Sequence, residues 1–181
     1  ILDSGADHAD LTDEYAAIPA DCRAVAAVCG GEVLREVPFE TFLSKLPECR
    51  RQCGDRAVLR AFHVYADNDR VAKQVEALRA GDFDAFLQLV NESGLSSWEY
   101  LQNVIPAGYK EHQEVAVAIA AAKHILNGHG AVRVHGGGFA GTVQAFVPVE
   151  LLADFKAQME TILGEGRCHV LSIRPEGGAV L

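Results

Sequence analysis

A run of three glycines within residues 133–142 (RVHGGGFAGT) constrains the fold more than any other feature of the chain. Glycine loses more conformational entropy on folding than other residues, so three in succession are tolerated where the backbone needs positive φ angles or must approach another group closely. The flanking segments, AVRVH and TVQAFVP, are short and β-branched, which is typical of strands. The sequence therefore predicts two neighbouring strands joined by a glycine-rich loop.

The first two thirds of the chain have helical periodicity. We expect a helix over residues 13–28, a short extended piece in EVLREV, one or two helical turns in PFETFLSKL, and a long helix over residues 56–79. The apolar face expected for the long helix consists of Val64, Val71, Val75 and Leu78.

The rest of the chain combines helices with strands. Asp82 can cap a further helix, and the stretch SSWE has the pattern of a capping box. Helices are expected over residues 112–126 and 148–163, and CHVLSIR has the composition of a last strand. Strand, helix and strand in that order suggest a right-handed crossover on one face of a sheet. The predicted fold class is α+β, with a small antiparallel or mixed sheet packed with several helices.

Composition excludes some classes of protein. The chain has 181 residues and a formal net charge of −9, which argues against nucleic acid as a partner, because phosphate contacts need clustered Lys and Arg. The longest apolar run, around residues 115–122, is too short to span a membrane. Five cysteines at irregular spacing indicate ordinary thiols in a reducing, cytoplasmic compartment; the alternative, a metal half-site at Cys49 and Cys53, lacks a second pair of ligands.

The glycine-rich stretch resembles the third signature of the galactokinases, a family of the GHMP small-molecule kinase superfamily. That signature is a Gly-Gly-Gly-Phe-Gly-Gly loop after an Arg-x-x triplet. The chain departs from it at His135, Ala140 and Thr142, where the family often has threonine, glycine and cysteine. The residues in matching places are Arg133, Gly136, Gly137, Gly138, Phe139 and Gly141.

Three other stretches resemble the same family in the order that it requires. DHADLTDEY is similar to the segment with a histidine and then an acidic-Glu-Tyr triplet, here ending at Tyr15, with Cys22 seven residues later. RAFHVYADNDRV and GDFDAFLQLVNESG are similar to two later helical segments. The resemblance covers nearly the whole chain and is to the C-terminal half of a galactokinase.

The resemblance implies which residues serve the function. Tyr15 would contact the sugar, and the glycine loop would line the active site, with Phe139 anchoring it in the core. His8 would lie near a cleft between domains. No catalytic residue and no metal ligand are expected in this half. From the residues themselves, His63 is expected to be buried and hydrogen-bonded, and the run 91–93 to cap the end of a helix.

The family's other signatures, including its Gly-Leu-Ser-Ser-Ser phosphate loop and an aspartate, belong to an N-terminal half. GLSS at residues 94–97 only imitates that loop, because it follows the tyrosine segment instead of preceding it. The first residue is Ile1, and we expect residues 1–12 to be a remnant strand segment of the N-terminal domain and residues 13–181 to be the C-terminal domain.

The resemblance implies transfer of phosphate from ATP, with Mg²⁺, to the anomeric hydroxyl of galactose. ATP and Mg²⁺ would be bound mainly by the N-terminal half, which is the expected partner of this chain, and the chain alone would be inactive. Two alternatives remain open at this point. One is another GHMP kinase, for a different sugar or small alcohol, and the other is a galactokinase-like regulatory protein that senses sugar.

Overall fold

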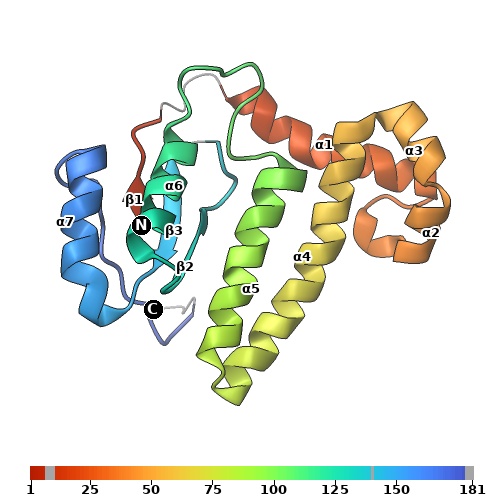
Figure 1. The fold of residues 1–181 in the computed structure, drawn as a ribbon. Helices are drawn as coiled ribbons and strands as arrows, with labels where there is room; N and C mark the ends of the chain where they lie inside the picture. Colours follow the sequence, from red (N-terminus) through yellow and green to blue (C-terminus); the bar gives the residue numbers. More distant parts are fainter. Residues whose placement is uncertain (7–10, 140, 178–181) are drawn as a thin grey trace.

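The computed structural model of the chain describes residues 1–6, 11–139 and 141–177, and Figure 1 shows their arrangement. A three-stranded sheet with two helices lies at one end, and a group of helices lies at the other. The elements are β1 (Leu2–Asp3), α1 (Thr12–Cys29), a 3₁₀ turn (Leu34–Glu36), α2 (Phe39–Ser44), α3 (Leu46–Cys53), α4 (Asp55–Ala80), α5 (Phe83–Ser96), a π-helix (Ser97–Leu101), α6 (Glu114–Leu126), β2 (Ala131–Val134), β3 (Thr142–Phe146), a second 3₁₀ turn (Val149–Leu151) and α7 (Leu152–Leu163).

The sheet is antiparallel, with the strand order β1-β3-β2. β2 and β3 pair with Val134 opposite Val143, so the predicted pair of strands joined by the glycine loop is confirmed. β1 pairs with the other edge of β3, with Leu2 opposite Val143, and Leu2 is buried. The first strand therefore finds its partner within this chain, whereas the sequence suggested a partner outside it.

The prediction of a last strand in CHVLSIR is wrong except at its first residue, Cys168. Cys168 forms a single bridge with Leu2, and the backbone after it makes no strand in the described part of the chain. Leu171 and Ile173 are 71% and 88% exposed, so the apolar side chains that suggested a strand face solvent instead of a sheet. After α7 the chain therefore returns to the sheet as expected, but it pairs with the sheet through one bridge instead of a strand.

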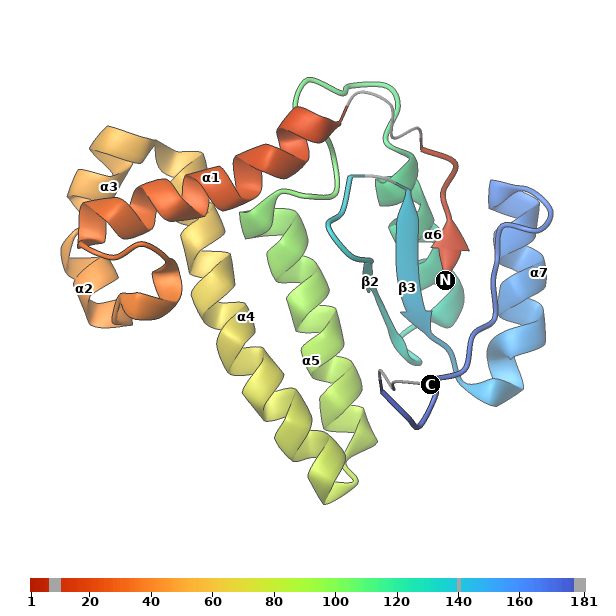
Figure 2. The same cartoon turned by 180° about the vertical axis from the view of Figure 1, so that it is seen from behind.

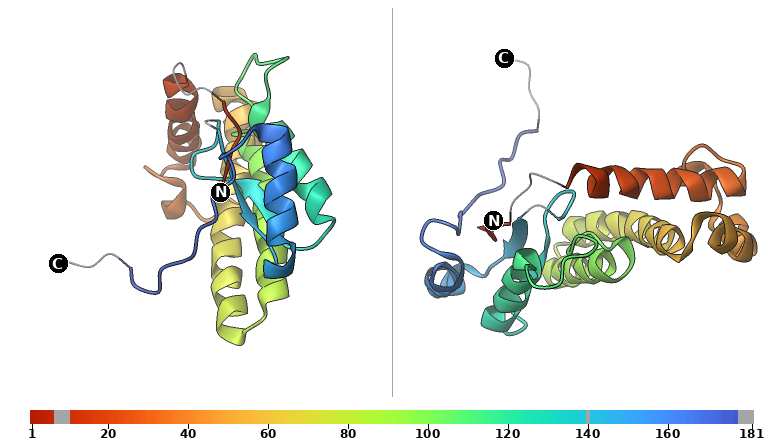
Figure 3. Two further views of the ribbon diagram at one scale, coloured as in Figure 1. Left: turned by 90° about the vertical axis from the view of Figure 1, so that its left-hand side faces the viewer. Right: turned by 90° about the horizontal axis from the view of Figure 1, so that it is seen from above.

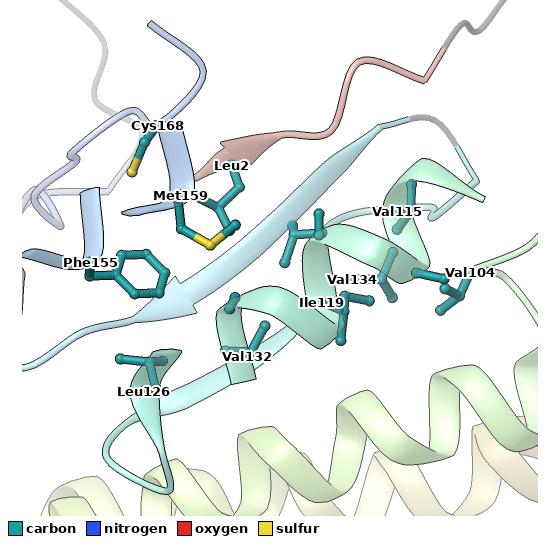
Figure 4. Close-up of a cluster of buried hydrophobic side chains, with 14 residues drawn as sticks. Leu2, Val104, Val115, Ile119, Leu126, Val132, Val134, Phe155, Met159 and Cys168 are labelled. Atoms are coloured by element: carbon teal, nitrogen blue, oxygen red, sulfur yellow. The ribbon is translucent and has the colours of Figure 1, made fainter. Parts of the chain in front are cut away.

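Two hydrophobic cores stabilise the molecule. The first lies between the sheet and the helices α6 and α7, where Figure 4 shows Phe155 and Met159 of α7 and Ile119 of α6 facing the strands. The second holds α1 to α4 together around Phe42, whose ring centroid lies 4.9 Å from that of Phe62. In Figures 2 and 3, α4 and α5 form an antiparallel pair that connects these two groups, with α4 on the side of α1 to α3 and α5 on the side of the sheet.

The apolar face predicted for the long helix α4 is wrong in its second half. Val71, Val75 and Leu78 are 55%, 39% and 51% exposed, and the buried apolar side chains lie mainly in the first half of the helix, for example Val58 and Ala61. Figure 1 shows the reason: the distal half of α4 projects together with α5 beyond the other helices, so only one side of it is covered.

Other local predictions also need correction. EVLREV forms a 3₁₀ turn instead of an extended piece, and α3 follows directly after α2 although no separate helix was expected there. SSWE is no capping box, because α5 continues through Ser96 and passes into the π-helix without a side-chain cap. Residues 91–93 consequently lie inside α5 and do not close it.

In the ranges that the structure describes, no helix combines the length and the apolar character needed to cross a membrane.

All five cysteines are free thiols. Cys49 and Cys53 lie on α3, and Cys49 is buried in the second core with its Sγ 3.7 Å from the Sγ of Cys29. Burial, together with the hydrogen bond to Cys29, raises the pKa of Cys49 to about 12. A neutral thiol packed among apolar side chains is the state expected of a structural cysteine.

Candidate functional site

A layer of polar side chains joins α5 to β2, the strand that precedes the glycine loop. Arg133 of β2 donates from Nη1 to the Oγ of Ser93 at 2.7 Å, and Ser93 donates in turn to Asp67 Oδ1 at 2.7 Å. Asn91 donates to the carbonyl of Gly130 at 3.1 Å and accepts from the N–H of Val132 at 3.0 Å. The residues that were expected to cap a helix therefore tie that helix to the sheet.

The contact between α5 and β2 is close because α5 has a glycine at the crossing. A methyl group at Gly94 would lie 2.8 Å from Cβ of Arg133 and 3.1 Å from the carbonyl oxygen of Val132. Both distances are shorter than ordinary van der Waals contact. Gly94, which belongs to the GLSS stretch, thus serves the packing of a helix on a strand.

The glycine loop connects β2 to β3 with an unusual backbone. Gly136 and Gly138 have φ angles of 61° and 84°, and Phe139 has a φ of 49°, which is uncommon for a bulky side chain. Phe139 is nevertheless 1% exposed, so its ring anchors the loop in the protein interior as expected. Gly141 follows at a φ of 94° and its carbonyl accepts from the N–H of Ser4 at 2.6 Å.

Tyr15, in the first turn of α1, contacts this loop although the sequence separates the two by more than 120 residues. Its hydroxyl donates to the carbonyl of Gly138 at 2.7 Å, and its ring packs edge-on against Phe139 with centroids 5.5 Å apart. A methyl group at Gly137 would lie 2.9 Å from Cε1 of the tyrosine ring. The structure therefore brings together the residues that the sequence singled out separately.

The loop leaves two consecutive N–H groups available. Gly136 and Gly137 are exposed, and neither N–H donates a hydrogen bond within the described ranges. Successive backbone N–H groups in a turn of mixed φ sign can bind an anion. A cavity of about 570 Å³ adjoins the loop at Phe139, and its lining combines apolar residues such as Leu11 and Val104 with charged ones such as Lys110 and Glu114.

Two contributors to the site were missed by sequence reasoning. Asn103, which follows the π-helix, packs against the loop and is 2% exposed. Arg60 of α4 is 1% exposed; it donates to Asp21 Oδ2 of α1 at 2.7 Å and to the carbonyl of Leu101 at 3.1 Å. In the sequence, the position of Arg60 among the apolar residues of RAVLRAF is the one sign that this arginine is buried.

His63 is buried and hydrogen-bonded, as expected. Its Nδ1 lies 2.9 Å from Ser96 Oγ, and its Nε2 lies 3.7 Å from Asp67 Oδ2. Burial lowers the pKa of His63, an effect that the charge of Asp67 opposes in part. The histidine therefore belongs to the polar layer beneath β2 as a neutral side chain.

The described residues offer no place for a metal ion: within them, no three His, Cys, Asp or Glu side chains are arranged to hold one. The side chains near the loop thus do not fit the role of Mg²⁺ ligands. His8, which was expected near a cleft, lies outside the described residues.

Comparison with known proteins identifies relatives of the chain. No family model matches the chain. Curated galactokinases do: that of Glaesserella parasuis serovar 5 is 32% identical over 150 residues, and that of Mannheimia succiniciproducens is 30% identical over 156 residues. These alignments cover 83% and 86% of this chain but 37% and 38% of the relatives, so the chain spans well under half of their length.

A solved structure, galactokinase of Lactococcus lactis complexed with galactose, superimposes on 91% of the chain with a TM-score of 0.70 at 20% identity, covering 40% of that protein. The chain thus has the fold of the matching part of this kinase, in agreement with the predicted α+β class. The matches in sequence identify the family to which this fold belongs. The chain is a member of the galactokinase family, as its motifs indicated.

Proposed function

We propose that this chain is the C-terminal portion of a kinase that transfers the γ-phosphoryl group of ATP to the anomeric hydroxyl of galactose. The observation that carries the proposal is the contact between Tyr15 and the glycine loop. It places a phenol that can donate and accept hydrogen bonds beside the N–H groups of two exposed glycines, which have no hydrogen-bond partner among the described residues. A sugar hydroxyl and a phosphate oxygen are the ligands that these two kinds of group would recognise.

The loop would act through its backbone. The N–H groups of Gly136 and Gly137 can donate to phosphate oxygens as negative charge shifts during transfer, and a donor that is already oriented costs no reorganisation at that moment. The absence of Cβ atoms lets the reacting groups approach this backbone closely. Phosphoryl transfer depends mainly on positioning and charge stabilisation, which matches a loop that offers donors and no acid or base.

Tyr15 would bind the sugar. Its ring is fixed by Phe139 and its hydroxyl by the Gly138 carbonyl, and a phenol is a group that can both donate to and accept from a polyol. A tyrosine held in this way loses little conformational entropy when a ligand binds.

ATP and Mg²⁺ would be held mainly by an N-terminal half of the same protein, since the chain has neither the family's phosphate loop nor suitable metal ligands among its described residues. Mg²⁺, when bound there, would neutralise charge on the transferring phosphate. Residues 13–181, with β1 paired to their strand β3, would then form a C-terminal domain that lacks activity alone. Its free cysteines favour the cytoplasm as the compartment.

The test is to express the full-length protein that contains this chain and to follow ADP release with galactose, glucose and arabinose. We expect turnover of about 1 to 100 per second with galactose and formation of a 1-phosphate. The 181-residue chain alone serves as the matched control and should give no turnover. Absence of turnover with galactose in a folded full-length protein would contradict the proposal.

A further inference from the structure

Asn103 holds the glycine loop by its main chain and its side chain together. The carbonyl of Asn103 accepts from the N–H of Phe139 at 2.6 Å, and its Nδ2 donates to the carbonyl of Gly137 at 3.2 Å. Gly138 lies so close that any Cβ there would collide with the carbonyl oxygen of Asn103. The side chain of Asn103 is 2% exposed, so these contacts exclude water.

The backbone around this contact is held in costly conformations. Asn103 follows a π-helix, Ser97–Leu101, and Gln102 adopts a left-handed φ of 57°. Across the contact, Phe139 is left-handed as well, with a φ of 49°. Such conformations and π-turns are rare and gather at functional sites, where the surrounding structure maintains them.

Two buried polar atoms add to this cost. Oδ1 of Asn103 and Oγ of Ser97 have no hydrogen-bond partner in the part of the chain that the structure describes. Leaving a buried acceptor unpaired is unfavourable, and native proteins rarely tolerate it without a reason. A segment that only connected the π-helix to α6 would need neither the strain nor the unpaired atoms.

The contacts fix two successive peptide planes. Asn103 Nδ2 holds the Gly137–Gly138 plane through its carbonyl. The Gly138–Phe139 plane is held from both sides, by the Tyr15 hydroxyl on its carbonyl and by Asn103 on its N–H. The exposed N–H groups of Gly136 and Gly137 come immediately before these planes, so their direction follows from the same contacts.

We propose that Asn103 is a positioning residue for phosphoryl transfer, which sets the direction of the loop N–H groups and their distance from Tyr15. The inference rests on the proposed function of the loop. Asn103 itself need not touch substrate, because it acts through Gly137, Gly138 and Phe139.

Asn91 provides a matched control for a purely structural role. It is also an asparagine that hydrogen-bonds the backbone of the β2–β3 hairpin, but at the opposite end, through Gly130 and Val132. Replacing Asn91 with alanine removes two hydrogen bonds to the hairpin without touching the loop. A general loss of stability would therefore be common to both positions, and a loss of loop geometry would be specific to Asn103.

The experiment compares Asn103→Ala, the nearly isosteric Asn103→Asp and Asn91→Ala in the full-length kinase, with kcat, KM and melting temperature measured for each. We expect both changes at Asn103 to lower kcat about 10- to 100-fold, since a displacement of about 1 Å has an effect of that order, while KM changes by less than about threefold. A carboxylate at residue 103 cannot donate to the Gly137 carbonyl, so the aspartate variant should fail without leaving a cavity. Asn91→Ala should lower the melting temperature and leave kcat unchanged.

Hydrogen exchange of the loop amides provides a second readout on the same proteins. We expect the amides of Gly138 and Phe139 to exchange at least about tenfold faster in the two Asn103 variants and not in Asn91→Ala. Wild-type kcat and wild-type exchange in folded Asn103 variants would overturn the inference. If the wild-type protein does not phosphorylate galactose, the proposed function fails, and unchanged loop exchange in Asn103→Asp would then reject the role of Asn103 independently.

Discussion

Replacing Gly136 and Gly138 singly by alanine should give clearly different losses of stability, although the two glycines lie in one loop and have similar φ angles of 61° and 84°. An L-residue in the left-handed region costs about 1–2 kcal/mol. Nothing lies within 4 Å of a methyl group built on Gly136. For Gly136→Ala we therefore expect this backbone cost alone, about 1–2 kcal/mol of the free energy of unfolding.

Gly138→Ala should lose more because the added methyl group meets the carbonyl oxygen of Asn103. That oxygen accepts from Phe139, and the Gly138 carbonyl itself accepts from Tyr15. Moving the loop away would weaken both hydrogen bonds, each of which contributes about 0.5–1.5 kcal/mol net. Added to the backbone cost, the loss should reach about 3 kcal/mol, which exceeds that of Gly136→Ala by at least 1 kcal/mol.

Urea unfolding of the 181-residue chain, followed by circular dichroism, measures both losses under one condition. The slope of the free energy against urea should be the same in the two variants, so that the midpoints report stability directly. Equal losses for the two variants would refute the reasoning, because the contact with Asn103 would then have no energetic weight. A larger loss for Gly136→Ala would show that the loop adopts a different backbone.

Three further predictions concern the scaffold beneath the loop. Gly94→Ala should destabilise the protein by about 1–3 kcal/mol in urea unfolding, because overpacking against Arg133 outweighs the usual gain of alanine in a helix; a stabilised variant would contradict the close contact. Arg60→Met should lower the free energy of unfolding by about 2–3 kcal/mol, because the Leu101 carbonyl and Asp21 lose a buried donor while Asp21 keeps its exposed bond to Arg56. A melting temperature equal to that of the wild type would argue against this. Burial lowers the pKa of His63 below its ordinary value of 6.5, so the unfolded chain binds the proton first as the pH falls, and the stability of the protein should decline below about pH 6.5. His63→Gln should flatten this decline. An unchanged pH profile of the melting temperature in that variant would assign the decline to other groups.

Periodicity predicted the parts of the fold that depend on local sequence. The long helices, the pair of strands and the glycine loop follow from apolar spacing and from where glycines stop a helix. The errors lie where tertiary contacts determine which side chains are buried. The valines of α4 have helical spacing and yet face solvent, because no neighbour covers the far end of the α4–α5 pair. The apolar residues after Cys168 likewise have no strand partner among the described residues.

The site was only partly predictable. The glycines and Tyr15 were visible from motifs, which record their types and order, but motifs contain no information on the contact between them. Asn103 has no local signal, since an asparagine after an aromatic stretch usually indicates a turn. Its role depends on a π-helix, and the SSWE pattern in that region favoured a capping box instead. A buried polar residue whose partners are distant backbone groups cannot be identified from sequence spacing alone.

The geometry of the loop is set within this chain. Arg60 joins α1, which carries Tyr15, to the end of the π-helix, which leads into Asn103. Tyr15 and Asn103 then hold the loop from two sides, and the hydrogen bond of Arg133 to Ser93 anchors the end of the strand before it. Because each of these contacts is between residues of the same chain, the loop should be arranged in advance of any second domain. A nucleotide-binding half would then supply phosphate and metal to donors that are already oriented, which is the condition under which backbone N–H groups contribute most to a reaction.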